Sequence, residues 1–250
     1  IAGLFKKNKV THFQGQGRLL AEGTLGGKSG ESGEALGAGQ SSQGVHAIEI
    51  IAQDNSKQII SGKNIILATG SDVAQIPNVS IDGKRIVSST EALSFKEIPK
   101  KMIVIGAGAI GLEMGSVWAR LGTKVIVVEF QDRIVPSCDK QITNELTKIL
   151  KKQGLDFKLS TKVLKAKPEG EKVFVETEDI ASGKKEMLDA DYVLVAVGRR
   201  PYSDYLGLKE LGIKQDKQGR VEVDSHFQTN VKGIFLLTIL NLAESAICSF

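Results

Sequence analysis

The chain has 250 residues, 41% of them hydrophobic and 25% charged, an ordinary composition for a globular protein with one large or two modest domains. The net charge of +4 is mild and the lysines are scattered without interleaved aromatic residues, which argues against nucleic acid as the main partner. No apolar run approaches the roughly 20 residues of a membrane-spanning helix. The chain begins without Met and shows no signal or transit peptide pattern, so we expect it to start inside a larger protein.

The first 71 residues predict a small β-meander that leads into a parallel strand. Three β-rich stretches with partial alternation carry this prediction: 8–20, 46–54 and 57–71. The Gly/Ser-rich segment 22–45 is predicted to be a mobile loop without chemistry of its own, because it cannot bury enough apolar surface to offset its ordering entropy. Within the third stretch, Asn64 to Ala68 is predicted as a strand. Thr69-Gly70-Ser71 then forms a tight turn at its carboxyl end, where ligands sit in open α/β sheets.

A glycine fingerprint follows at residues 102–111. Met102 to Ile105 is a short apolar run, typical of a strand buried on both faces of a parallel sheet. Gly106, Gly108 and Gly111 then spell G-x-G-x-x-G. The first glycine allows a tight turn, the second lets the backbone approach a pyrophosphate, and the third permits close packing of a helix on the strand. The phosphates are expected on the N–H groups at the positive end of that helix.

The helix after the fingerprint is predicted to bury one apolar stripe, made of Ile110, Met114, Val117 and Leu121. Gly122 is its predicted C-cap, and Lys124 to Val128 is the next strand.

Glu129 ends that strand, 18 positions after Gly111 and close to the ~20 expected for the acid that hydrogen-bonds an adenosine ribose. A carboxylate at this place repels a 2′-phosphate, so NAD is favoured over NADP. Arg133 is interpreted as a solvated loop residue. The order of strand, turn, helix, strand and acid predicts a Rossmann unit, and the alternative is a chance glycine turn in an ordinary α/β core.

The rest of the chain continues the α/β pattern. Ile142 to Gly154 is predicted as an amphipathic helix with a glycine stop, and 156–167 as a strand. Residues 172–198 are predicted to supply a hairpin-like crossover and a buried final strand. The apolar run Ile234 to Leu242 is too short for a bilayer and is interpreted as the end of a core strand, or as an aggregation-prone segment.

Four stretches in this order resemble the FAD-dependent pyridine-nucleotide disulfide oxidoreductases: "IILATGS" (65–71), "IPKKMIVIGAGAIGLEMGSVWARLG" (98–122), "YVLVAVGRRP" (192–201) and "LGLKELGI" (206–213). The resemblance runs from about Asn8 to Phe235. "GLEMGSVW" and Glu129 favour the dihydrolipoamide dehydrogenase branch over the NADP-using members. The resemblance implies an α/β fold in which a Rossmann-type NAD-binding domain is inserted into a FAD-binding domain that is partial here. The expected boundaries are 1–84 and 206–250 for the FAD part, with a divergent tail after 235, and 85–205 for the NAD domain.

The resemblance also implies cofactor contacts, and no metal site is expected. The flavin nucleotide is expected to contact Gly17, Thr69, Gly70 and Ser71. NAD is expected to contact Gly106, Ala107, Gly108, Ala109, Ile110, Gly111, Leu112, Glu113, Glu129, Val163 and Gly198. Glu113 is expected where the nicotinamide meets the flavin, and the alternative is a solvent-facing helix carboxylate.

The residues that perform the family's chemistry are not matched. Its members oxidise dihydrolipoyl groups through a redox cysteine pair and FAD to NAD, and thiol exchange needs one attacking thiolate and one resolving thiol close by. Cys138 and Cys248 stand far apart and lie in no such motif, so no catalytic residue is assigned. The family's Gly-Asp after "GIF" and its acid/base His are also unmatched. His12 and His226 are predicted to be strand-associated structural residues, and His46 a loop residue. We therefore expect a truncated chain that is inactive alone.

For the whole enzyme the resemblance implies partners and a location. The partners are the lipoyl carrier domains of 2-oxoacid dehydrogenase or glycine cleavage complexes, with no nucleic acid and no membrane. The family forms homodimers through an interface domain that is not matched here, and the expected location is the mitochondrial matrix. Two other interpretations remain open. One is a catalytically inactive NAD-binding module or truncated paralogue. The other is a short-chain dehydrogenase, suggested by Tyr205-x-x-x-Lys209 although such a domain begins with its glycine motif.

Overall fold

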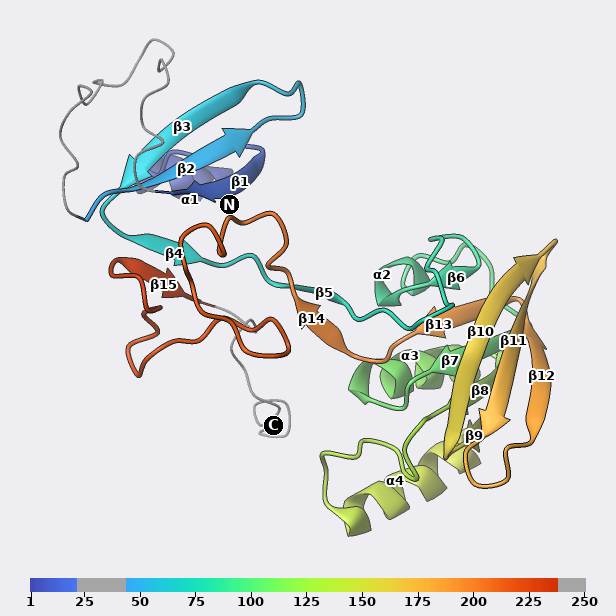
Figure 1. Ribbon diagram of the computed structural model, residues 1–250. Coiled ribbons are helices and arrows are strands. Elements are labelled where there is room, and N and C mark those ends of the chain that lie inside the picture. The colour runs from blue at the N-terminus through green and yellow to red at the C-terminus, as the bar shows by residue number, and fades with distance from the viewer. Residues whose placement is uncertain (22–43, 238–250) are drawn as a thin grey trace. The chain divides into compact units, whose positions relative to one another are not determined.

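The computed structural model describes residues 1–21 and 44–237, which divide into two compact units. Among these residues, the first unit combines the chain up to Ser71 with residues 200–237, and the second is Asp72–Arg199 (Figure 1). The predicted Gly/Ser-rich loop lies almost wholly outside the described residues. The chain thus changes units after residues 71 and 199, where the sequence-based boundaries were 84 and 205. The assignment of FAD and NAD to the two units remains a prediction.

The first unit is mostly β-structure. Its elements are α1 (Ala2–Lys7), β1 (Gln16–Leu20), β2 (His46–Ile51), β3 (Lys57–Gly62), β4 (Ile65–Leu67) and β15 (Ile234–Leu236). β1, β2 and β3 form an antiparallel sheet in that order, which confirms the predicted meander. β4 pairs in parallel with β15, so two segments far apart in the sequence lie side by side. The apolar run predicted to begin at Ile234 is therefore a strand as far as Leu236.

The second unit is an α/β structure of three layers (Figure 1). Its elements are β6 (Ile86–Val87), α2 (Ser89–Ala92), β7 (Lys101–Ile105), α3 (Ala109–Arg120), β8 (Lys124–Val128), α4 (Lys140–Lys152), β9 (Leu155–Lys158), β10 (Thr161–Glu169), β11 (Lys172–Asp179), β12 (Lys185–Ala190) and β13 (Tyr192–Val195). A parallel sheet in the order β6-β13-β7-β8-β9 forms the middle layer. The helices pack on one face of this sheet, and the antiparallel meander β10-β11-β12 packs on the other. β5 (Ser71–Val73) and β14 (Arg199–Pro201) form a separate two-stranded sheet.

The central strands are apolar on both faces because both faces are covered. Val104 and Val125 pack against the helices, whereas Ile103 and Ile126 pack against the meander. The predicted buried strand at 102–105 and the buried final strand before Gly198 are both confirmed. Within the described part of the chain, no helix is long and apolar enough to cross a membrane.

Helix α3 turns a different face to the sheet from the one predicted. Val117 and Leu121 of the predicted stripe are 47% and 50% exposed, while Gly111, Gly115 and Trp118 are buried. The predicted stripe is therefore wrong for half of its members. Glycine at 111 lets the helix approach the strands closely, because a Cβ there would overlap the carbonyl oxygen of Gly106. An argument based on hydrophobic residues alone gives such small residues no weight.

Three further predictions are corrected. The single strand predicted at 156–167 is two strands, β9 and β10, because the chain turns between them at Ser160, which has a φ of 48°. His46 is no loop residue: it begins β2, is 5% exposed, and its Nε2 lies 2.8 Å from the carbonyl oxygen of Lys232. His12 and His226 are exposed and lie outside the strands, so they are not strand-associated.

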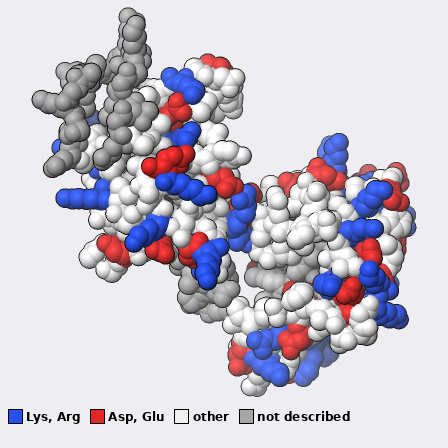
Figure 2. All heavy atoms as spheres, viewed as in Figure 1, with Lys and Arg blue, Asp and Glu red and all other residues white. Residues whose placement is uncertain are grey.

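Cross-strand ion pairs cover the outer face of the meander. Lys162 pairs with Glu178 at 2.8 Å, and Lys165 with Glu176 at 3.4 Å, in both cases across the β10–β11 register. Figure 2 shows basic and acidic side chains interspersed on the visible face of this unit. Exposed pairs of this kind contribute only about 0–1 kcal/mol each. Their main effect is to favour the register that turns Val163 and the apolar residues of β11 toward the parallel sheet.

Asp82 organises the turn that leads into β6. Its Oδ1 accepts hydrogen bonds from the backbone N–H groups of Lys84, Arg85 and Ile86, at 2.7, 2.8 and 2.9 Å. Burial by itself raises the pKa of this carboxyl, but the three N–H bonds outweigh burial and lower it. A lowered pKa means that the carboxylate stabilises the fold above its unfolded-state pKa, and that this stability is lost as the pH falls through the native value.

We expect Asp82→Ala to lower the free energy of unfolding by about 1–2 kcal/mol at pH 7, because three N–H groups lose their acceptor. The difference from the native chain should shrink as the pH falls below the unfolded-state pKa of about 3.9 and through the lowered native pKa. Urea unfolding followed by the fluorescence of Trp118, the one tryptophan in the sequence, measures this in the unit concerned. Asp156→Ala, at an exposed position in β9, is the control. A difference that stays the same throughout the acid range in which the native chain is still folded would show that the charge plays no part.

Candidate functional site

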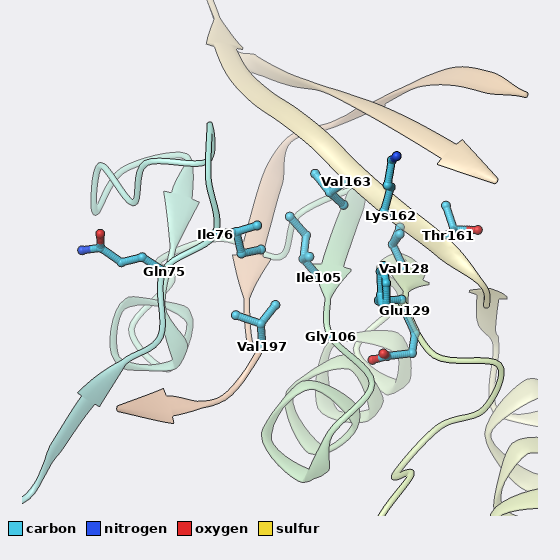
Figure 3. A pocket seen from close by; sticks show the side chains of 11 residues that line it. Gln75, Ile76, Ile105, Gly106, Val128, Glu129, Thr161, Lys162, Val163 and Val197 are labelled. Atoms are coloured by element: carbon cyan, nitrogen blue, oxygen red, sulfur yellow. The ribbon is translucent and has the colours of Figure 1, made fainter. Parts of the chain in front are cut away.

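A cavity of about 420 Å³ lies in the second unit at the carboxyl ends of β7 and β8 (Figure 3). The sheet supplies Ile105 and Val128, with Gly106 and Glu129 just beyond these strands. The remaining lining residues are Gln75, Ile76, Phe130, Thr161, Lys162, Val163 and Val197. Parallel α/β sheets bind ligands at this edge, and the volume lies within the range of small-molecule pockets.

The three glycines of the fingerprint serve different purposes. Gly106 has a φ of +103°, and a Cβ there would lie 2.5 Å from the carbonyl oxygen of Ala196. A Cβ at Gly111 would overlap the carbonyl oxygen of Gly106, so the contact of α3 with the turn requires glycine. Gly108 differs from both, because its φ is −76° and a Cβ would meet nothing within 4 Å. The fold itself therefore does not need glycine at 108. Because glycine has no side chain, open space remains over this residue, where a ligand can approach the backbone.

The amino end of α3 borders this open space. Gly108 is the N-cap, and no side chain in the described part of the protein makes a cap hydrogen bond there. The N–H of Leu112 donates to the carbonyl of Gly108, while the N–H groups before it have no partner within the helix. Unpartnered N–H groups at the positive end of a 12-residue helix form a site for a phosphate group.

Glu129 is held beside this helix end by two backbone N–H groups. Its Oε2 accepts from Ala107 at 2.6 Å, and its Oε1 accepts from Gln131 at 2.8 Å. Figure 3 shows the carboxylate turned toward the glycine turn. A carboxylate has about four acceptor positions, so two remain available for ligand hydroxyl groups. The two N–H groups thus fix the direction of the carboxylate and leave part of its hydrogen-bond acceptor capacity free for a ligand.

The walls of the cavity are mainly apolar. Ile76, Val163 and Val197 come from three separate segments and surround the end of β7 in Figure 3. The ammonium of Lys162 points away from Glu129 in that view and pairs with Glu178. Arg133 donates to the carbonyl of Pro136 at 2.8 Å. Apolar walls with one carboxylate match a purine nucleoside whose ribose carries no 2′-phosphate.

The structure brings together three of the predicted NAD contacts, Gly106, Glu129 and Val163, as lining residues of one cavity. Ala107 to Leu112 form the turn and first turn of α3 beside it, and Gly198 follows the lining residue Val197. Glu113 is exposed on α3 and makes no hydrogen bond or ion pair with the described residues. Its role therefore remains a prediction.

Sequence reasoning missed several lining residues. Val197 adjoins the predicted Gly198, so the same motif pointed to its neighbourhood. Ile76 and Thr161 lie in no motif and carry no local signal. They reach the cavity because the segment after β5 and the start of β10 both pass the end of the parallel sheet.

The predicted flavin contacts lie in the first unit. Gly17 is in β1, and Thr69 donates its hydroxyl to the carbonyl of Tyr202 at 2.8 Å. Gly70 has a φ of +73°, as a tight turn requires. A cavity of about 870 Å³ in this unit is lined by Gln16 and Arg18, and none of the four predicted residues is among its lining. The flavin contacts therefore remain a prediction.

Two other candidate groups receive no support from the structure. Tyr205 is 77% exposed in a left-handed turn, with a φ of 65°, and belongs with Lys209 to the first unit rather than to the unit with the glycine fingerprint. Cys138 lies just before α4, and Cys248 falls outside the described residues. Among the described residues, no cluster of His, Cys, Asp or Glu is arranged to hold a metal ion.

Comparison with known proteins agrees with this geometry. A family model described as pyridine nucleotide-disulphide oxidoreductase matches residues 5–238. Mitochondrial dihydrolipoyl dehydrogenase of Pisum sativum is 44% identical over 237 residues, which are 95% of this chain and 43% of the relative. Leghemoglobin reductase of Glycine max is 43% identical over 237 residues, which are 95% of this chain and 41% of the relative. Mitochondrial dihydrolipoyl dehydrogenase of Schizosaccharomyces pombe is 47% identical over 231 residues, 92% of this chain and 41% of the relative. The chain thus spans less than half the length of these relatives.

Two solved structures share the fold. LpdA from Mycobacterium tuberculosis superposes with a TM-score of 0.73 at 23% identity, over 89% of this chain and 44% of that one. The HOCl-induced flavoprotein disulfide reductase RclA from Escherichia coli has a TM-score of 0.68 at 28% identity, over 78% of this chain and 43% of that one. The predicted α/β fold class is confirmed.

Proposed function

The chain belongs to the pyridine nucleotide-disulphide oxidoreductase family, and we propose that its second unit binds NAD in the cavity beyond β7 and β8. The cofactors of the family are FAD and NAD. One observation carries the proposal: the open space over Gly108 lies beside both the uncapped end of α3 and the oriented carboxylate of Glu129. Together they offer an anion site and an acceptor of ribose hydroxyls.

Each part of the site has a role toward NAD. The pyrophosphate lies over Gly108 on the N–H groups of Ala109, Ile110 and Gly111. Glu129 accepts the adenosine ribose hydroxyls, and Val163 bounds the adenine. Glu113 and Gly198, the remaining predicted contacts, are proposed to lie on the nicotinamide side of the site. Bound NAD supplies the acceptor for a hydride, and the residues named here bind and orient it.

The first unit is proposed as the partial FAD-binding domain, with Gly17, Thr69, Gly70 and Ser71 as flavin contacts. The matched relatives support this assignment, and the whole protein is proposed to be a dihydrolipoyl dehydrogenase. Such an enzyme oxidises dihydrolipoyl groups through a redox disulfide and FAD to NAD. Its proposed partners are lipoyl carrier domains of 2-oxoacid dehydrogenase or glycine cleavage complexes, and its proposed state is a homodimer. The relatives from Pisum sativum and Schizosaccharomyces pombe are named as mitochondrial, which supports a proposed location in the mitochondrial matrix.

A second candidate is an NAD-binding module without catalytic activity, or a truncated paralogue. The observation on its side is that the two cysteines of the 250 residues given, Cys138 and Cys248, lie far apart in the sequence. The 250-residue chain, supplied with FAD, dihydrolipoamide and NAD, is expected to bind NAD without producing NADH. Lipoamide-dependent NADH formation by this chain would exclude the inactive module.

Glu129→Gln tests the nucleotide site directly. We expect the Kd for NADH to rise about tenfold, because a buried or partly buried hydrogen bond to a charged group contributes about 1.5–3 kcal/mol. The preference for NADH over NADPH should shrink, since the repulsion between the carboxylate and a 2′-phosphate is removed. Titration calorimetry with both nucleotides measures these effects.

Glu171→Gln is the matched control, because Glu171 is an exposed carboxylate in the turn between β10 and β11. It should bind both nucleotides as the native chain does. Unchanged NADH affinity in Glu129→Gln would remove Glu129 from the site, and no NADH binding by the native chain would reject the proposed function.

A further inference from the structure

The segment between β5 and β6 forms one wall of the cavity although it belongs to no motif. Ile76 lines the cavity from this segment, as Figure 3 shows. The N–H of Val79 donates to the carbonyl of Ile76 at 3.2 Å, which makes residues 76–79 a tight turn. We call residues 75–79 the strap. Its position decides how far Ile76 reaches into the cavity.

Asn78 joins the strap to β10 through two hydrogen bonds. Its side-chain Nδ2 donates to the carbonyl of Leu164 at 3.4 Å, and its own carbonyl accepts from the N–H of Ala166 at 3.2 Å. Both bonds connect residues more than 80 positions apart in the sequence. They are the hydrogen bonds that the described residues show between the strap and β10.

The part of β10 that Asn78 contacts is a β-bulge. Val163 pairs with Thr177 and Lys165 with Glu176, so Leu164 has no partner in the register with β11. An extra residue in a strand leaves backbone groups without ladder bonds, and bulges are frequent beside functional sites, where they redirect a side chain. Here Asn78 bonds to the unpaired Leu164, and the adjacent Val163 is the residue that lines the cavity.

We propose that Asn78 is a positioning residue for the nucleotide site, fixing the strap to the bulge so that Ile76 and Val163 keep their places in the cavity wall beside the adenosine half of the ligand. This inference rests on the proposed NAD site. Asn78 is not among the residues that line the cavity, so its proposed effect on the ligand is indirect. It acts by bonding the strap, which carries Ile76, to β10, which carries Val163.

Asparagine suits this position for two separate reasons. The backbone at 78 has a φ of 62°, in the left-handed region that asparagine tolerates better than most residues. The amide also supplies the donor that the carbonyl of Leu164 accepts. Glycine would keep the backbone conformation and lose the donor. Aspartate would tolerate the backbone and place a carboxylate oxygen against a carbonyl oxygen, which repel each other.

The test uses Asn78→Gly and Asn78→Asp in the full 250-residue chain. We expect the Kd for NADH to rise about threefold in Asn78→Gly and about tenfold in Asn78→Asp. ADP-ribose, which lacks nicotinamide, should lose affinity by the same factors. The amide proton of Ala166 should exchange faster with solvent in both variants. In NMR spectra, the shift that NADH induces at the Val163 amide should shrink.

Asn55→Gly and Asn55→Asp are matched controls. Asn55 has nearly the same backbone conformation, with a φ of 63°, but lies in the β2–β3 turn of the first unit. These variants should bind NADH and ADP-ribose as the native chain does. Urea unfolding followed by Trp118 fluorescence shows that the second unit of each variant is folded under the titration conditions.

The outcomes separate the two proposals. If the native chain binds NADH and folded Asn78 variants bind it equally well, Asn78 does not position the site and the inference is overturned. If the Asn78 variants lose stability while retaining native affinity, the strap is structural only, which also overturns it. If the native chain does not bind NADH, the proposed function fails and the inference fails with it.

Discussion

The variant Gly111→Ala should lower the free energy of unfolding of the second unit by about 3 kcal/mol, because its Cβ would overlap the carbonyl oxygen of Gly106. The clash is with the backbone of the glycine turn, which cannot rotate away as a side chain can. Relief requires that α3 move off β7 or that the turn deform. The midpoint of thermal unfolding should fall by roughly 10 °C. Trp118 lies on α3 and reports this transition by its fluorescence.

Gly115→Ala is the matched control on the same helix. A Cβ at Gly115 would lie 3.4 Å from Val125 Cγ1 and 3.5 Å from Leu155 Cδ2, which are ordinary packing distances. Alanine is also the better helix former by about 1 kcal/mol. This variant should therefore be as stable as the native chain or more so. Equal destabilisation by both substitutions would contradict the special role assigned to the close contact at Gly111.

The variant Gly108→Val should weaken NADH binding at least tenfold while leaving the second unit folded. The φ of −76° is allowed for valine, and the space that a Cβ would enter is empty. Apolar residues with a side chain are poorer N-caps than glycine, so replacing the N-cap Gly108 by valine should lower the free energy of unfolding, but by less than about 1 kcal/mol. The added methyl groups instead occupy the place where the pyrophosphate approaches the helix N–H groups. Calorimetric titration and thermal unfolding of the same sample measure the two effects separately.

The ligand series locates the obstruction within the nucleotide. NADH and ADP-ribose both contain the pyrophosphate and should lose affinity alike in Gly108→Val. Adenosine lacks the pyrophosphate, so its weak affinity should be the same for Gly108→Val as for the native chain. Gly108→Ala should fall between the native chain and the valine variant. Full NADH affinity in Gly108→Val would show that the pyrophosphate does not pass over this residue.

Part of the site is predictable because its parts are close in the sequence. Gly106, Gly111 and Glu129 belong to one strand-helix-strand unit, whose spacing follows from strand length, helix length and the sharp turn between them. Each requirement is local: a left-handed φ at Gly106, a close contact at Gly111, and a carboxylate where β8 ends. The sequence alone therefore establishes the Rossmann unit and the place of its acid.

Other features depend on packing between distant segments. The buried face of α3 was predicted wrongly because burial there follows from the close approach of the helix to the sheet at Gly111. His46 was predicted in a loop, yet it begins β2 and lies against Gly233. Hydrophobic periodicity describes one element at a time and gives no weight to a glycine or histidine that a neighbouring element covers.

By itself the sequence determined the glycine turn, the acid at the end of β8 and the family, because these depend on short-range spacing and on motifs in a set order. Only the tertiary structure decided which residues wall the cavity. Ile76 and Val163 both line it because the strap and the meander pack on the same face of the sheet, and Asn78 bonds one to the other. Such contacts arise from the burial of apolar surface between segments far apart in the chain, which no local pattern records.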